Sequence, residues 1–441
     1  MTEPLNCLIM GAAGRDFHDY LTFFRDEDRF RVLAFTATQI PFIESRSFPR
    51  ELAGAGCEAD ILIYPEERLA ELIRELDIDF VFLAYSDLPH AEVMHKASLV
   101  QASGAAFSLL GPKQTQLKSN LPVISVTAVR TGAGKSPLTQ WLARRLIEHG
   151  HRPGVIRHPM PYGDLSKQVV ERFATLEDLD RFECTIEERE EYTPYVEQSI
   201  PIYAGVDYRR ILEAAEQNDD VILWDGGNND YSFIRPDLSI VVADALRAGH
   251  EAEFYPGETN FRSADVIVIS KTRHAGARDI AMIRDNARRL NPDAGVVESD
   301  LALSVADPEL IRGRRVLVIE DGPTLTHGGM EFGAGFLAAQ QTGAAEMLDP
   351  RPAAVGSIAE TFQRYPHVRN VLPACGYSTE QLRDLQQTIE GCSPEVVVDA
   401  SPAGIERLIE LPCPVARVRY SFVQTSGAPI EQRVLGVLAD A

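Results

Sequence analysis

Residues 123–146 constrain the fold of this chain more than any other stretch. They read VISVTAVRTGAGKSPLTQWLARRL, in which an apolar run is followed by a glycine-containing turn and then by apolar residues at helical spacing. Leu138, Trp141, Leu142 and Leu146 would share one face of that helix. A strand, a glycine loop and a helix in this order are the setting that a phosphate-binding loop requires.

The loop VRTGAGKS has Val129 where the usual pattern G-x-x-x-x-G-K-[ST] has its first glycine. It resembles the variant K-G-G-x-G-K-[ST] of the SIMIBI class of nucleotide hydrolases and transferases, with Arg130 at the signature lysine. We expect Arg130 either to clamp phosphate, which we favour, or to be a surface arginine. The residues expected to contact the nucleotide are Thr131, Gly132, Ala133, Gly134, Lys135 and Ser136. Lys135 would reach the β- and γ-phosphates, and the Ser136 hydroxyl would ligate Mg²⁺.

An acidic residue at the end of a buried strand is the expected partner of such a loop, because it holds Mg²⁺ directly or through water. The stretch VILWDGGNND supplies Asp225 after four apolar residues, and Gly226 and Gly227 let the backbone approach a γ-phosphate. The alternative is an ordinary turn or helix-cap aspartate. We therefore expect Ser136 and Asp225 to bind the metal.

Strands and helices alternate on both sides of this loop. The runs LNCLIMGAAGRDFHDY, FRVLAF and FVFLAY predict a Rossmann-like domain over residues 1–120, in which Gly11 and Gly14 serve a tight turn. The stretch LGPKQTQLKSNLPV, rich in Gly, Pro and polar residues, is the predicted linker. A P-loop NTPase-like core follows over 121–345, and a C-terminal α/β extension over 346–441. The predicted fold class is α/β with a mostly parallel core sheet.

The composition favours small molecules as partners. The net charge of -22 argues against a sequence-independent grip on nucleic acid or anionic lipid, since both need a basic surface. No apolar run reaches the ~18 residues of a membrane span. The six cysteines are too scattered for a zinc ribbon or a disulfide frame. We expect a soluble, cytoplasmic protein with no nucleic-acid or membrane partner.

Charged and polar residues gather where the predicted strands end, and that edge of an open α/β sheet binds ligands. The residues expected to bind a second, heavily charged anion are Arg157, His158, Arg247, His250, Glu258, Asn260, Thr326 and His327. Lys271 stands where base-reading GTPases carry N-K-x-D, and we expect it to pack against the base or ribose, of ATP rather than GTP. The acidic run at 187–191 is predicted to be a solvated helix face, with a second cation site as the alternative.

Six motifs together carry a family resemblance: VRTGAGKS, RHPMPYGDL, EEREEY, RAGHE, YPGETN and EDGPTLTHGGM. With them the chain closely resembles cyclic 2,3-diphosphoglycerate synthetase and its bacterial relatives over nearly its whole length. The resemblance implies that ATP drives ring closure of 2,3-bisphosphoglycerate, or of a closely related phosphorylated acid, with release of ADP and phosphate. It also implies a Mg²⁺ cofactor and a homodimer.

Under this resemblance the catalytic residues are Lys135, Arg130, Asp225, His250 and His327. Lys135, Arg130 and Mg²⁺ would neutralise the phosphoryl donor, while the cationic residues at the strand ends would hold the acceptor. Two alternatives stay open. One is a SIMIBI-type ATPase or GTPase switch or metallochaperone, although the chain has no His- or Cys-rich tract. The other is a small-molecule kinase that closes no ring.

Overall fold

The first part of the chain is built on a six-stranded sheet in the computed structural model, whose described residues are 3–12, 14–38, 46–54, 57, 59–158, 165–227, 230–326, 329–374, 379–402 and 404–440. The strand order is β3-β4-β2-β1-β5-β7, and β1 pairs in parallel with both β2 and β5. The strands are β1 Leu5–Met10, β2 Phe30–Ala37, β3 Ser47–Phe48, β4 Ile61–Pro65, β5 Phe80–Leu83 and β7 Ala106–Ser108. This is the Rossmann-like arrangement expected from the sequence.

Helices cover both faces of this first sheet, which explains why its strands are apolar without alternation. Phe17 and Phe24 pack with Ile9 on one face, and Leu72 and Val93 pack on the other. The helices are α1 Arg15–Asp19, continued by a π-helical turn over Tyr20–Phe24, α2 Arg50–Ala53, α3 Leu69–Glu75, α4 His90–Ser103 and α5 Pro112–Thr115.

The central part holds the strand and helix that flank the glycine loop. Its strands run in the order β10-β11-β9-β12-β8-β13-β15-β16, parallel except at β10. They are β8 Val123–Ala128, β9 Pro153–Arg157, β10 Glu171–Phe173, β11 Ile202–Ala204, β12 Val221–Asp225, β13 Leu238–Asp244, β15 Val266–Ser270 and β16 Gly295–Val305. The expected α/β class with a mostly parallel core sheet is confirmed.

Helices also cover both faces of the central sheet. One face packs against α6 and α8, and the other packs against α9, α10 and α11. The helices are α6 Lys135–Glu148, α7 Leu176–Arg181, α8 Ile186–Val196, α9 Tyr208–Glu216, α10 Gly257–Ser263 and α11 Ala277–Leu290. A short antiparallel pair, β6 Leu88–Pro89 with β14 Phe254–Tyr255, joins the first part to the central part.

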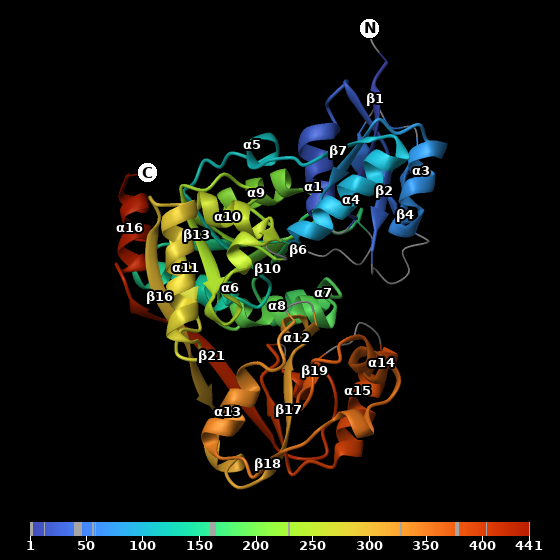
Figure 1. Cartoon of the computed structure of the whole chain (residues 1–441). Helices are drawn as coiled ribbons and strands as arrows, with labels where there is room; N and C mark the ends of the chain where they lie inside the picture. The colour runs from blue at the N-terminus through green and yellow to red at the C-terminus, as the bar shows by residue number, and fades with distance from the viewer. Residues whose placement is uncertain are drawn as a thin grey trace.

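A long antiparallel pair, β16 with β21 Val415–Ser426, carries the sheet into the C-terminal part (Figure 1). The remaining strands and helices there are β17 Arg315–Asp321, β18 Glu346–Met347, β19 Leu372–Ala374, β20 Val396–Asp399, α12 Gly322–Thr326, α13 Ala334–Thr342, α14 Gly356–Arg364 and α15 Thr379–Cys392. The hydrophobic core of this part begins at Ile311, whereas the sequence-based division placed the boundary at residue 345. The last helix, α16 Ile430–Asp440, returns to pack against the central core.

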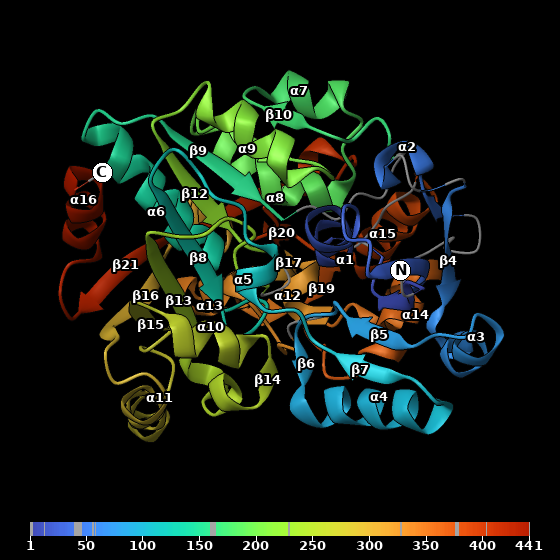
Figure 2. The ribbon, with the colours of Figure 1, turned by 90° about the horizontal axis from the view of Figure 1, so that it is seen from above.

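The three parts meet around the carboxyl edge of the central sheet. Seen from above, the N-terminal part lies beside the central sheet, and strands of the C-terminal part are visible behind both (Figure 2). A cavity of about 1500 Å³ opens there, and Asp87, Lys135 and Asp321 line it from the three parts in turn. Among the described residues, no helix combines the length and apolarity that crossing a membrane needs.

Candidate functional site

The glycine loop has the backbone of a phosphate-binding loop. It leaves β8 at Ala128 and enters α6 at Lys135, and both Gly132 and Gly134 have positive φ, 75° and 107°. A Cβ at Gly134 would meet no atom within 4 Å, so glycine is needed there for its backbone conformation and not for space. The expected strand, loop and helix are therefore in place for the nucleotide contacts predicted at 131–136.

Three side chains support the loop by donating hydrogen bonds to three successive carbonyl oxygens. Arg247 Nη2 donates to the oxygen of Thr131, Lys271 Nζ to that of Gly132 and Ser270 Oγ to that of Ala133, each at 2.7 Å. Together these bonds fix three consecutive peptide planes, as a preorganised anion site requires.

Asp244 organises this support. Its Oδ2 lies 2.8 Å from both Arg247 Nη2 and Lys271 Nζ, and it is fully buried. Although burial acts to raise it, the two cations hold the pKa of Asp244 below its usual range. The structure thus gives Arg247 and Lys271 contacts with the loop, and the substrate and base contacts expected from the sequence stay predictions.

Arg130 also turns away from the phosphate side of the loop. Its Nε lies 2.5 Å from Asp87 Oδ1, its Nη1 lies 2.8 Å from His250 Nδ1, and its guanidinium covers the Phe254 ring at 3.7 Å. Burial, and then the guanidinium groups of Arg130 and Arg247, lower the pKa of His250, so its Nδ1 accepts from Arg130. Arg130 is therefore a contact between the first and central parts in this structure, and the phosphate clamp that we favoured stays a prediction.

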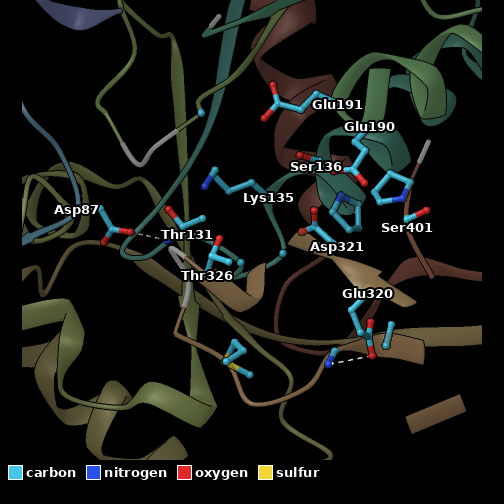
Figure 3. Close-up of a pocket in the computed structure, with 18 of the residues that line it drawn as sticks. Asp87, Thr131, Lys135, Ser136, Glu190, Glu191, Glu320, Asp321, Thr326 and Ser401 are labelled. Atoms are coloured by element: carbon cyan, nitrogen blue, oxygen red, sulfur yellow. Dashed lines mark hydrogen bonds between the residues drawn. The ribbon is translucent and has the colours of Figure 1, made fainter. Parts of the chain in front are cut away.

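Lys135 is buried at the centre of the site. Burial lowers the pKa of Lys135 to about 8, although Asp225 acts to raise it. Figure 3 shows its side chain between Asp87 on one side and Glu190 and Glu191 on the other. The charged form of a lysine in this environment is stabilised when phosphate oxygens bind beside it. This suits the predicted role of Lys135, which is to neutralise the phosphates of the phosphoryl donor.

The expected metal ligands lie on either side of one guanidinium group. Arg157 Nη1 lies 3.1 Å from Ser136 Oγ and also contacts Asp225 Oδ2, which accepts from Tyr195 at 2.6 Å. Asp225 is fully buried, and its Oδ1 has no hydrogen-bonding partner among the described residues. A hydroxyl and a buried carboxylate with an unsatisfied oxygen are oxygen ligands of the kind that Mg²⁺ prefers, and the Arg157 guanidinium contacts both of them in this structure. Glu191 holds the other side of Arg157 at 2.7 Å.

The acidic run that contains Glu191 is not a solvated face. Glu188 is buried and completes a capping box with Thr185 at the start of α8, and Glu190, 3% exposed, lines the cavity. No cluster of three or more His, Cys, Asp or Glu side chains suited to a metal occurs within the part of the chain that the structure describes.

The other predicted substrate residues are dispersed. Thr326 lines the cavity, and His158 lines it near the first part of the chain. Glu258 accepts from Arg262 at 2.7 Å on α10, and neither it nor Asn260 is among the described residues that line the cavity. His327, predicted to be catalytic and substrate-binding, lies outside the described residues.

Sequence reasoning missed Asp87, which lies in the first part of the chain. Its Oδ2 accepts the N–H of Thr131 at 3.2 Å, and its φ is +60° (Figure 3). A signal was available, because SDLP follows the apolar run FVFLAY directly and a strand-end acid at a sheet edge is a candidate ligand residue.

Known proteins resemble this chain over nearly its whole length or over shorter stretches. Arginine synthetase ArcE of Thermococcus kodakarensis is 54% identical over 428 residues, which cover 97% of this chain and 95% of the relative. The family model of tetraacyldisaccharide-1-P 4'-kinase, LpxK, matches residues 99–297. Tetraacyldisaccharide 4'-kinase of Thiobacillus denitrificans is 33% identical over 137 residues, 30% of this chain and 38% of that protein. The crystal structure of LpxK from Aquifex aeolicus with ATP covers 74% of this chain and 90% of its own, with a TM-score of 0.42 and 11% identity.

The P-loop at the carboxyl edge of a parallel sheet, together with these matches, makes the chain an ATP-using enzyme of the kinase and synthetase class. It belongs to the family of arginine synthetase ArcE, since the identity extends over both chains almost from end to end.

The reaction implied by the resemblance, ring closure of 2,3-bisphosphoglycerate, is wrong, because the full-length relative is an arginine synthetase. The structure explains the error. Two of the cationic residues that suggested a second polyanion are bound to protein groups: Arg247 to the loop and Asp244, and Arg157 to Asp225 and Glu191. The motifs therefore identify the nucleotide site and leave the acceptor unspecified.

Proposed function

We propose that this chain forms arginine from citrulline, ammonia and ATP, with release of ADP and phosphate. The observation that carries the proposal is the 54% identity to arginine synthetase ArcE over nearly the full length of both chains. A buried P-loop lysine, Lys135, supports the use of ATP in that synthesis.

Phosphoryl transfer by a P-loop enzyme and the arginine product in the relative's name together suggest the acceptor. A P-loop site transfers the γ-phosphoryl group to an oxygen or a similar nucleophile, largely by positioning and charge neutralisation. The guanidinium group of arginine differs from the ureido group of citrulline by one nitrogen in place of one oxygen. Phosphorylation of that ureido oxygen converts it into a leaving group. Ammonia then attacks the ureido carbon, and the oxygen departs as part of the released phosphate. One ATP, one citrulline and one ammonia thus balance one arginine, one ADP and one phosphate.

The described side chains suit the phosphoryl-transfer step of this reaction. Lys135 would neutralise the β- and γ-phosphates, and the loop N–H groups, fixed by Arg247, Lys271 and Ser270, would bind phosphate oxygens. Ser136 and Asp225 would hold Mg²⁺, which supplies further neutralisation of phosphate charge when bound.

The cavity suits two substrates of this size. At about 1500 Å³ it exceeds the range of a typical small-molecule site, so a nucleotide and an amino acid fit together. Carboxylates from all three parts, among them Asp87, Glu190 and Asp321, face this space, and carboxylates are suited to hold ammonium and a guanidinium product. The homodimer expected from the resemblance stays a prediction.

The experiment is an arginine assay with purified chain, ATP, citrulline and ammonium. We expect arginine, ADP and phosphate in equal amounts, and no arginine when any one substrate is left out. Lys135→Met should abolish synthesis, whereas Lys118→Met, a change at an exposed lysine, should leave it intact. ATP hydrolysis that is the same with and without citrulline would reject the proposal.

A further inference from the structure

The first sheet has a ligand crevice of its own, which opens into the same cavity as the glycine loop. From β1 the chain adds β2 and β4 on one side and then crosses to β5 and β7 on the other, all in parallel. The strand order therefore reverses between β1 and β5, and ligands of such sheets bind beyond the carboxyl ends of the strands at that point. Ala12 comes shortly after β1, residues 84–87 follow β5, and all of them line the cavity.

Asp87 joins this crevice to the glycine loop. Its Oδ1 accepts from Arg130 Nε at 2.5 Å, and its Oδ2 accepts from the N–H of Thr131 at 3.2 Å. Its φ of +60° is a sparsely populated value that surrounding contacts must hold. Figure 3 shows the Lys135 amine turned to the side on which Asp87 lies. Asp87 therefore borders the space where a γ-phosphate beside Lys135 would meet its acceptor.

The Asp87 carboxylate has capacity left for a ligand. Each carboxylate oxygen can accept two hydrogen bonds, and within the described residues each accepts one. The side chain is 13% exposed and lines the cavity. A ureido group matches such a carboxylate, because two of its N–H groups point the same way and both can be accepted at once. The ureido oxygen then points away from Asp87.

A cation and a carboxylate suited to an amino-acid head group lie in the same crevice. Lys96 Nζ contacts Glu66 and lies 3.8 Å from Glu92 Oε1, and both Lys96 and Glu92 line the cavity. Among the described residues Lys96 donates one hydrogen bond, to Glu66, so its other N–H groups remain for a ligand carboxylate. The Glu92 side chain is 48% exposed and can accept from a ligand ammonium group.

The scale of the crevice suits one amino acid. Lys96 Nζ lies 5.5 Å from the centre of the Tyr85 ring, and Tyr85 stands two residues before Asp87. Two residues of chain span at most ~7 Å. The α-carbon and the ureido carbon of citrulline are separated by five bonds, about 6 Å when extended. A head group held near Lys96 therefore has a side chain of the length needed to approach Asp87.

We propose that this crevice of the first part binds citrulline, with the ureido N–H groups on Asp87 and the head group at Lys96 and Glu92; this rests on the proposed function. The ureido oxygen then faces the γ-phosphate held by the glycine loop, so the first part binds the acceptor and the central part binds the donor. Positive charge develops on the ureido group as its oxygen is phosphorylated and replaced by nitrogen. The Asp87 carboxylate stabilises that charge up to the guanidinium product.

Two ligands separate the two ends of the site. Arginine and norvaline share the head group, and only arginine carries N–H groups for Asp87. In Asp87→Asn we expect arginine binding, measured by calorimetry, to weaken by about tenfold or more, as loss of charge-assisted hydrogen bonds does. Norvaline binding, measured by competition with arginine, should change by less than about threefold. Lys96→Gln should weaken both ligands by similar factors.

Two further variants test a structural role and another location. Arg130→Gln breaks the same ion pair and leaves the carboxylate in place, so arginine affinity should change by less than about threefold. Arg364 of α14 lines the cavity from the C-terminal part, and Arg364→Gln should change neither affinity. Equal losses of arginine affinity in Asp87→Asn and Arg130→Gln would overturn the site, as would a loss in Arg364→Gln with none in Lys96→Gln.

These binding measurements are separate from the test of the proposed function. If the wild-type chain makes arginine while Asp87→Asn and Lys96→Gln bind it unchanged, the crevice is not the acceptor site. Absence of arginine synthesis by the wild-type chain would instead reject the proposed function itself. If Asp87→Asn does not fold, Lys96→Gln carries the comparison, and unchanged affinities for both ligands there would overturn the proposal.

Discussion

Arg157 and Asp225 form a buried ion pair where β9 and β12 end side by side. The same guanidinium group contacts Ser136, so a side-chain cation lies between the two residues expected to hold Mg²⁺. The guanidinium of Arg157 therefore balances the negative charge of Asp225 before any nucleotide binds. This relationship connects the stability of the ligand-free chain with its metal chemistry.

Removing the buried partner of Arg157 should destabilise the ligand-free chain. Asp225→Asn leaves a guanidinium that is only 6% exposed without its buried carboxylate, and we expect a loss of about 3 kcal/mol in the free energy of unfolding. Urea unfolding measures it. Glu191→Gln is the matched control, because the Glu191 side chain is 36% exposed and its loss should cost under about 1 kcal/mol. Equal losses in the two variants would contradict the buried pair as described.

Nucleotide affinity should fall as the pH rises above 8. Burial lowers the pKa of Lys135 to about 8 in the ligand-free chain, and bound phosphates favour the charged amine and raise that pKa. The complex therefore binds more protons than the free chain above pH 8, so binding takes up protons there and weakens with pH. Calorimetry of ADP binding in buffers of different ionisation enthalpy counts these protons. Lys135→Arg, which stays charged, should remove the uptake; an unchanged uptake in that variant would assign it to another group.

Arg130 should matter more for the contact between the two parts than for phosphate. Since its guanidinium is bound to Asp87 and His250 and lies over Phe254, Arg130→Gln should change ADP affinity by less than about threefold. The variant should lose about 1 to 3 kcal/mol of stability through its broken buried contacts, seen in thermal unfolding. A tenfold or larger loss of ADP affinity would instead support Arg130 as a phosphate clamp.

Support of the glycine loop should be measurable at Ser270. Its hydroxyl donates to the oxygen of Ala133 at 2.7 Å and is buried, so Ser270→Ala leaves that carbonyl oxygen unsatisfied. A cost of about 1.4 kcal/mol in the nucleotide-binding conformation corresponds to roughly tenfold weaker ADP binding. Ser263→Ala removes an exposed hydroxyl that bonds Thr259 within its own helix, and ADP affinity should not change. Identical affinities in both variants would argue against loop support.

The local part of the site was predictable from sequence, because a phosphate loop is encoded by consecutive residues. Gly132, Gly134 and Lys135 stand in one short stretch between a strand and a helix, and the structure keeps that order. Asp225 was predictable for a related reason, since parallel strands bring their carboxyl ends to one edge.

The direction of each charged side chain was not predictable. The sequence places Arg247 and Lys271 near the sheet edge, but their pairing with Asp244 depends on how β13 and β15 lie side by side. Asp87 reaches the loop from another part of the chain, across 43 residues from Arg130. Motifs made of such residues identify a nucleotide site, and they carry no information on which oxygen receives the phosphoryl group.

The central claim is that the phosphoryl group passes to the ureido oxygen of citrulline, and one isotope measurement tests it directly. Citrulline labelled with ¹⁸O in its ureido group is incubated with the chain, ATP and ammonium, and the released phosphate is analysed by mass. The account predicts one ¹⁸O atom in the phosphate for every arginine formed. Unlabelled phosphate alongside labelled citrulline would contradict it, because the phosphoryl group would then have passed to water.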